Sequence, residues 1–297
     1  MTEALCGHSF SASAISAVNK SLDEALRAFA ERRLSEPFPY LILDARYEKV
    51  REAGIIISQA VLIAVAVDGE GRRQIIGVNL AGRESRSSWR EFLLALQERG
   101  LFGVEFVVSD DHPGLKLAIC EVFTGAAWQR CYVHFLRNAL DHLPRKLADD
   151  CLQELRWIGA CPRAGGDGPG GPARARRGAS RYRRLAGPLA GQASQAVRLG
   201  RGEHRGDADP RLRGGRLYYR LPVQHHKHMK STNMLERLNQ ELKRRTHVVR
   251  IFPNAESCLR LVRALAVETH ENWLEGTRYL NMQHLAEHKK EALREAA

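Results

Sequence analysis

Two short, mostly apolar runs, each followed by an aspartate, constrain the fold of this chain most. The run over 38–43 precedes Asp44, and the run over 104–109 precedes Asp110. Short apolar stretches bounded by turn-forming residues are typical of strands buried inside a sheet. We therefore predict two buried strands that each end in a carboxylate.

The surrounding sequence alternates between strand and helix patterns. The first strands are expected at about 40–44, 58–67 and 73–80, and the turn signal Asp68–Gly71 makes them an antiparallel meander. Two more strands are expected at 104–109 and 127–130. Helical spacing predicts helices over 13–33 (with Ser21 as a candidate cap), 87–99, 113–123, 133–157, 232–246 and 255–273. This order predicts an α/β fold, in which helices flank a mixed sheet.

A third acid, Glu236, lies within the helix expected near 231–245. Two aspartates on strands and one glutamate on a helix can build a two-metal site that cuts and joins phosphodiesters. Mg²⁺ is a hard cation that prefers carboxylate oxygens. Adjacent carboxylates repel one another without the metal. Asp44, Asp110 and Glu236 are therefore candidate catalytic residues and metal ligands.

Each acid also has a structural alternative. Asp44 could merely end its strand, since Asp is common at turns. Asp110 could cap the following helix, or Asp111 could take its functional place. Glu236 lies three residues after Asn233 and could be its capping-box partner. These alternatives are the commoner ones for a single acid, but the combination of three favours a site.

Cys131 and His134 have the spacing of metal ligands. Zinc needs four ligands, and no second Cys/His pair follows at a finger-like distance. We therefore favour a packed cysteine and a polar histidine over a zinc site.

The histidines of His225–His228 also resemble a metal cluster, but Lys230 and the basic run Lys243–Arg245 follow them. This setting favours a basic edge that faces phosphates. For Lys243–Arg245, a solvated helix face remains an equal alternative to DNA contact.

The net charge is +12 over 297 residues, which is typical of a chain with a polyanionic partner. Residues 159–215, called the arginine–glycine segment below, hold 12 Arg against four acids and so contribute +8, which leaves +4 for the rest. Gly, Arg, Ala and Pro make up 41 of its 57 positions. With so little apolar surface to bury, we predict the segment to be disordered.

Three origins of the arginine–glycine segment stay open: a flexible basic linker, an RNA-binding segment, and translation from a shifted reading frame. We favour the shifted frame, because the composition changes abruptly at both edges. A back-translation of Gln195–Asp209 with freely chosen third bases, read one base later, is also compatible with an amphipathic helix.

No run of 18 or more apolar residues exists, so no membrane span is expected. The N-terminus lacks a basic flank followed by an apolar region, which argues against secretion. The six cysteines include no Cys-x-x-Cys pair. A reducing, cytoplasmic location fits this usage.

Long stretches of the chain resemble bacterial insertion-sequence transposases of the Mutator type. The similar stretches are Phe38–Arg51, Val107–Lys116, Trp128–Asn138, Ser231–Thr246 and Arg250–Asn254, and the resemblance covers about 1–157 and 217–297. It implies a DDE recombinase with an RNase H-like fold, in which a helical insertion separates the second aspartate from the glutamate.

In this resemblance the triad falls on Asp44, Asp110 and Glu236, and the family's Cys-x-x-His signature falls on Cys131 and His134. Asp44 would bridge two Mg²⁺ (or Mn²⁺) ions, and Asp110 and Glu236 would each complete one metal's shell. The partner would be double-stranded DNA, both element ends and target, bound by a homo-oligomer. Candidate DNA contacts are Arg137, Lys230, Arg237, Lys243, Arg244 and Arg245.

The chain departs from the family in two ways: it starts late, and the arginine–glycine segment stands where the insertion is expected. We divide it into a remnant of an N-terminal DNA-binding region (1–36), the first part of the catalytic core (37–157), a disrupted insertion (158–216) and a C-terminal part of the core (217–297). We expect a defective transposase. The alternative is a non-catalytic DNA-binding remnant, and a simple RNase H-like nuclease is a third option.

Overall fold

The computed structural model describes residues 7, 11–141 and 221–296. The predicted insertion at 158–216 lies outside these residues. So does the second part of the helix expected over 133–157. Those predictions therefore remain predictions.

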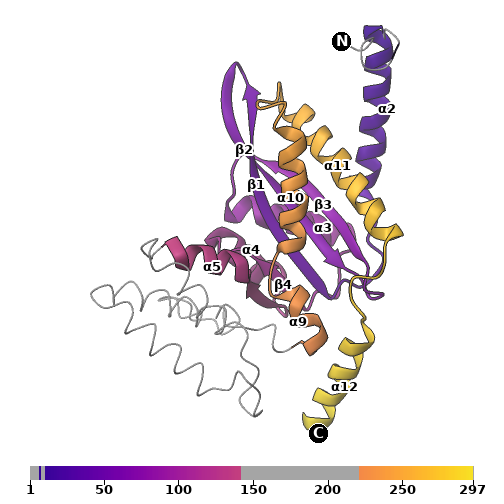
Figure 1. The fold of residues 1–297 in the computed structure, drawn as a ribbon, viewed down its shortest axis with the longest axis vertical. Coiled ribbons are helices and arrows are strands. Elements are labelled where there is room, and N and C mark those ends of the chain that lie inside the picture. The colour runs from indigo at the N-terminus through magenta and orange to yellow at the C-terminus, as the bar shows by residue number, and fades with distance from the viewer. Residues whose placement is uncertain (1–6, 8–10, 142–220, 297) are drawn as a thin grey trace, which may run out of the picture.

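A five-stranded mixed sheet forms the centre of the described chain (Figure 1). Its strand order is β3-β2-β1-β4-β5: neighbours among the first three strands are antiparallel, and β4 and β5 run parallel to β1. The strands are β1 (Tyr40–Glu52), β2 (Ile55–Val67), β3 (Arg73–Ala81), β4 (Phe106–Ser109) and β5 (Ala127–Arg130). The predicted meander and the α/β class are confirmed.

The described helices are α2 (Ala12–Glu31), α3 (Arg86–Glu98), α4 (Pro113–Val122), α5 (Tyr132–Asp141), α9 (Val223–Met229), α10 (Asn233–Thr246), α11 (Ala255–Glu275) and α12 (Gln283–Ala296). The sequence predicted all of them except α9 and α12. Ser11 caps α2, since its Oγ accepts a hydrogen bond from the backbone N of Ala14 at 3.1 Å. Ser21 therefore lies inside the helix, and the prediction that it is the cap is wrong.

The β1–β2 hairpin is longer than predicted. Its pairing extends from Tyr40 opposite Val67 to Glu52 opposite Ile55. Ala53 and Gly54 have φ values of 48° and 83°. Positive φ at both central residues is the turn geometry whose twist suits a two-residue hairpin. Because β2 supplies hydrogen bonds along its whole length, β1 continues through Glu52, and the prediction that Asp44 ends its strand is wrong.

Helices cover both faces of the sheet, and the alternation of side chains along β1 shows how (Figure 1). Tyr40 and Ile42 pack in a core with residues of α10 and α11, such as Leu238. Leu41 and Leu43, whose side chains point to the opposite face of β1, pack in a second core with residues of α3, such as Trp89. Burying each large apolar side chain stabilises the fold by roughly 1.5–3 kcal/mol.

Of the helices that the structure describes, none is both long enough and apolar enough to cross a membrane.

Candidate active site

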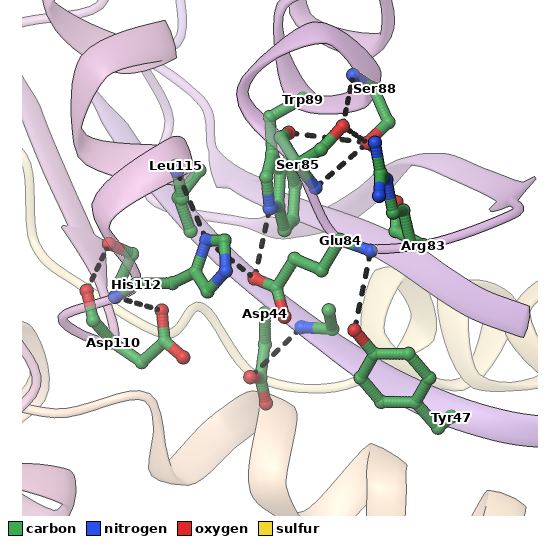
Figure 2. A network of polar contacts seen from close by, with 12 residues as sticks. Asp44, Tyr47, Arg83, Glu84, Ser85, Ser88, Trp89, Asp110, His112 and Leu115 are labelled. Carbon is green, nitrogen blue, oxygen red and sulfur yellow. Dashed lines mark hydrogen bonds and ion pairs between the residues drawn. The ribbon is translucent and has the colours of Figure 1, made fainter. Parts of the chain in front are cut away.

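Asp44 and Asp110 lie next to each other where β4 leaves the sheet. The parallel pairing of β1 with β4 ends at Ile42 opposite Val108, and continuing this register by two residues brings Asp44 opposite Asp110. Ile42 and Val108 belong to the core that α10 and α11 cover. Side chains two residues apart on a strand share a face, so both aspartates lie on the α10 side of the sheet. Figure 2 shows the two carboxylates near one another.

The carboxylate of Asp44 is held in a buried, polar setting. Asp44 is only 7% exposed to solvent. Oδ1 accepts a hydrogen bond from the backbone N of Ala45 at 3.0 Å, and Oδ2 accepts one from Nδ2 of Asn239 at 2.8 Å. The pKa of Asp44 is raised to about 7: burial is the largest cause, the charge of His134 acts against it, and the charges of Asp110 and Glu236 add to the rise.

Glu236 lies in the first turn of α10. The backbone N of Glu236 donates to the carbonyl of Thr232 at 2.9 Å. Its Oε1 is buried without a hydrogen-bond partner, although Nη1 of Arg137 lies 3.4 Å away. Thr232, and not Asn233, is the N-cap, and it makes no side-chain cap bond. The capping-box alternative for Glu236 is therefore wrong.

The structural alternatives for Asp110 also fall on other residues. His112 caps α4, since its Nδ1 accepts from the backbone N of Leu115 at 3.3 Å. Asp110 accepts from the backbone N of His112 at 3.2 Å (Figure 2). Asp111 pairs instead with Arg130 at 3.1 Å and with the ammonium of Lys116 at 3.4 Å. Asp111 is thus engaged in ion pairs with two cationic side chains.

Cys131 and His134 form a polar pair beside the three acids. The Sγ atom of Cys131 accepts hydrogen bonds from the backbone N and Oγ1 of Thr232 at 3.3 and 3.2 Å. Burial acts to raise the pKa of Cys131, but hydrogen bonds from His134 and Thr232 outweigh it, and the pKa is lowered. The hydrogen bond to Cys131 raises the pKa of His134 to about 9 against burial, and Asp44 and Asp110 add to the rise. This shift favours the protonated, positively charged form of His134 near the acids.

The predicted DNA contacts spread over a wider surface. Arg137 faces Glu236, and Nζ of Lys230 lies 5.8 Å from the ring centroid of Tyr132. Arg237 is exposed. Its positive charge helps to lower the pKa of Arg73.

The basic end of α10 is partly neutralised. Arg244 and Arg245 both donate to Glu241, at 2.6–2.9 Å, whereas Lys243 is exposed. At about 1.5 Å per residue, this end of the helix lies roughly 10–14 Å from Glu236 along the helix axis.

His225 does not belong to the predicted phosphate-facing edge. His225 is buried; its Nδ1 bonds the hydroxyl of Tyr40 at 2.8 Å and its Nε2 bonds the carbonyl of Asn281 at 2.9 Å. Burial lowers the pKa of both His225 and His228. The prediction of a basic edge is therefore wrong for His225, because its ring ties α9 to the sheet.

Two residues beside the acids were not predicted. Asn239 bonds Asp44, and its position three residues after Glu236 on the same helix face was the available signal. Glu84, in the loop before α3, accepts from Nε1 of Trp89 at 2.9 Å (Figure 2). Burial raises the pKa of Glu84, and the nearby charge of Asp110 adds to the rise. No sequence pattern indicated Glu84.

Among the described residues, no group of three or more His, Cys, Asp or Glu side chains is arranged so that it could hold a metal ion. The donor chemistry is nevertheless that of a hard cation, because Asp44, Asp110 and Glu236 offer only oxygen atoms.

Comparison with known proteins places these residues in a family context. The model of the family "Transposase, Mutator family" matches residues 1–165 and 216–276. The interval between the two matched parts falls inside the arginine–glycine segment.

Relatives extend along most of the chain. The transposase for insertion sequence element ISRM5 of Rhizobium meliloti is 63% identical over 299 residues, which cover 100% of this chain and 70% of the relative. That for IS406 of Burkholderia multivorans is 40% identical, covering 92% and 66%. That for IS256 in transposon Tn4001 of Staphylococcus aureus is 34% identical, covering 95% and 68%. The chain thus spans 66–70% of the length of these relatives.

Similarity to solved structures is weaker. The Drosophila P element transposase strand transfer complex is 11% identical with a TM-score of 0.31, covering 94% of this chain and 79% of that chain. This likeness is too low to support a fold assignment.

Proposed function

The chain belongs to the Mutator family of transposases, and we propose that it descends from an enzyme that cleaves DNA and transfers strands with Asp44, Asp110 and Glu236. The observation that carries the proposal is geometric: the β1–β4 register continued by two residues brings Asp44 opposite Asp110, and Asn239, three residues after Glu236 on α10, donates to Oδ2 of Asp44 at 2.8 Å. The three carboxylates come from distant parts of the chain and lie on the same side of the sheet.

We further propose that the fold is RNase H-like. The order β3-β2-β1-β4-β5 supports this, with a three-stranded antiparallel meander followed by two strands parallel to β1. In such a sheet the first and fourth strands are neighbours. Acids placed just beyond the paired residues of these two strands therefore lie side by side, as the register of Asp44 and Asp110 illustrates.

The proposed cofactor is Mg²⁺ or Mn²⁺, held by the three carboxylates. When bound, divalent ions activate the attacking hydroxyl or water and stabilise the leaving oxygen. Two features of the chain fit such ions: the pKa of Asp44 near 7, which shows the cost of a buried and unneutralised carboxylate, and the unpartnered Oε1 of Glu236. Since the described acids do not form a complete ligand group, ion binding would draw them together.

The neighbours of the acids orient them. Nδ2 of Asn239 holds Oδ2 of Asp44, and Arg137 holds Glu236 by charge. His134, with its pKa near 9, offsets part of the negative charge. These contacts would restrict the carboxylates to the arrangement that ions and a phosphodiester require.

Double-stranded DNA is the proposed partner. Arg137 lies 3.4 Å from Glu236 and is the strongest candidate for a phosphate contact, while Lys230, Arg237, Lys243, Arg244 and Arg245 would contact DNA further away. We propose that 1–36 contributes to DNA binding, that 37–157 and 217–297 form the catalytic core around the interrupted 158–216, and that the active form is a homo-oligomer.

A nicking assay tests the proposal. The full chain is incubated with a supercoiled plasmid that carries the DNA flanking its gene, in Mn²⁺, in Mg²⁺ or in chelator. Metal-dependent nicks with 3′-hydroxyl ends that are lost in Asp44→Asn, Asp110→Asn and Glu236→Gln would support the proposed chemistry and would contradict the expectation that this copy is defective. Glu105→Gln, a change at an exposed carboxylate paired with Lys289, serves as the control. Salt-sensitive DNA binding without nicking in every variant would favour the non-catalytic remnant.

A further inference from the structure

One buried cysteine links the segment that carries the second aspartate to the helix that carries the glutamate. The backbone N of Cys131 donates to the carbonyl of Ser109 at 2.6 Å, and Ser109 directly precedes Asp110. The Sγ atom of Cys131 accepts from the backbone N and hydroxyl of Thr232, whose carbonyl in turn accepts from the backbone N of Glu236. Hydrogen bonds through Cys131 and Thr232 thus connect Ser109, the residue before Asp110, to Glu236.

The side chain of Thr232 is used in an unusual way. A threonine at an N-cap ordinarily accepts a hydrogen bond from a backbone N–H of its own helix. Here Thr232 makes no such bond and its hydroxyl donates to Cys131 instead. Both residues are fully buried, so water cannot replace the contact.

Ser109 is itself fixed from the other side. Nε1 of Trp128 donates to Oγ of Ser109 at 2.9 Å, and this hydroxyl donates to the carbonyl of Asp110 at 2.8 Å. A second hydrogen bond, from the backbone N of Tyr132 to the carbonyl of Lys230 at 2.8 Å, joins the same two segments as the contact between Cys131 and Thr232. Several hydrogen bonds therefore join the end of β5 to the start of α10, although about a hundred residues separate the two in sequence.

We propose that Cys131 is a positioning residue: its contact with Thr232 fixes Glu236 relative to Asp110. The proposal rests on the function proposed above and adds a specific role for the cysteine of the Cys-x-x-His pair. Loss of the contact lets the first turn of α10 shift, and a shift near 1 Å costs about 10²-fold in rate.

Four variants separate this role from general stability. Cys131→Ala removes the sulfur, Thr232→Val removes only the hydroxyl in a side chain of the same shape, and Cys131→Ser restores an acceptor. Cys258→Ala is the matched control, because Cys258 is an equally buried cysteine that packs among apolar residues of the core under α11.

Hydrogen–deuterium exchange of the peptide over 232–238 gives a readout independent of activity. We expect exchange about 10-fold faster in Cys131→Ala and in Thr232→Val, with partial restoration in Cys131→Ser and no change in Cys258→Ala. Wild-type exchange in both Cys131→Ala and Thr232→Val would overturn the proposal, as would equal acceleration in Cys258→Ala. If Cys131→Ala does not fold, Thr232→Val decides.

Nicking rates give the second readout. We expect kcat to fall about 10²-fold with unchanged KM in Cys131→Ala, and no further loss when Thr232→Val is added. Unchanged kcat in an active enzyme would refute the positioning role. If the wild type does not nick DNA at all, the proposed function fails, whereas the exchange experiment still decides whether Cys131 positions α10.

Discussion

Replacing Asp44 by asparagine is expected to stabilise the metal-free protein at about pH 8 and not at about pH 4. Burial, with the charges of Asp110 and Glu236, raises the pKa of Asp44 from 3.8 to about 7. Each unit corresponds to about 1.4 kcal/mol, so ionising this carboxylate in the folded protein costs about 4 kcal/mol more than in the unfolded chain.

The sign follows from proton binding. Between about pH 4 and pH 7 the folded protein keeps the proton that the unfolded chain has lost, so the stability of the wild type falls as the pH rises through this window. Asparagine does not titrate. It can still accept from Asn239, but it loses one of the two hydrogen bonds of the carboxylate, which costs about 1 kcal/mol. The net gain is about 3 kcal/mol at pH 8, against a loss of about 1 kcal/mol at pH 4.

Urea unfolding in the presence of chelator, followed by the fluorescence of the buried Trp89 and Trp128, measures both values. Adding Mg²⁺ at pH 8 should narrow the difference, because the proposed ions stabilise only the wild type. An asparagine variant that is less stable than the wild type at pH 8 would refute the reasoning. It would mean that the Asp44 carboxylate ionises in the fold without a desolvation cost.

Three further outcomes are expected. Gly71→Ala should destabilise the fold by more than 2 kcal/mol, or about twice the cost of Gly54→Ala, in thermal unfolding. Both glycines have a positive φ, but only at Gly71 would the added Cβ meet a carbonyl oxygen, that of Leu280, at 1.8 Å; equal costs would contradict this. Glu241→Ala frees two arginines of α10, so this variant should bind duplex DNA more tightly. The dependence of its binding constant on salt concentration, measured by fluorescence anisotropy, should steepen by up to about two phosphate contacts. An unchanged salt dependence would exclude these arginines from the DNA interface. Sequencing the gene should reveal, in a shifted frame across the arginine–glycine segment, an uninterrupted helix-coding stretch, and stop codons in both other frames would refute the frameshift.

Much of the fold was predictable because strand and helix patterns are local. The apolar run of β2 and the turn over 68–71 specify a strand and its reversal through neighbouring residues alone. The length of β1 was not predictable in this way. Its second half is polar, and it stays a strand because the whole of β2 pairs with it.

The contacts of the site depended on packing. Asn239, Thr232 and His225 each look ordinary in the sequence. They bond Asp44, Cys131 and Tyr40, which lie about one to two hundred residues away along the chain. No pattern of spacing predicts such pairs, because they exist only where one element docks against another.

The sequence by itself determined the order of strands and helices, the acidic residue types, and the motifs through which the chain resembles its family. Tertiary structure alone decided that β1 and β4 are neighbours, that α10 covers the face on which Asp44 and Asp110 lie, and that the pKa of Asp44 is near 7. The physical reason is that periodicity acts through adjacent residues, whereas the loss of water around a carboxylate and the field of its neighbours arise only when distant segments pack together.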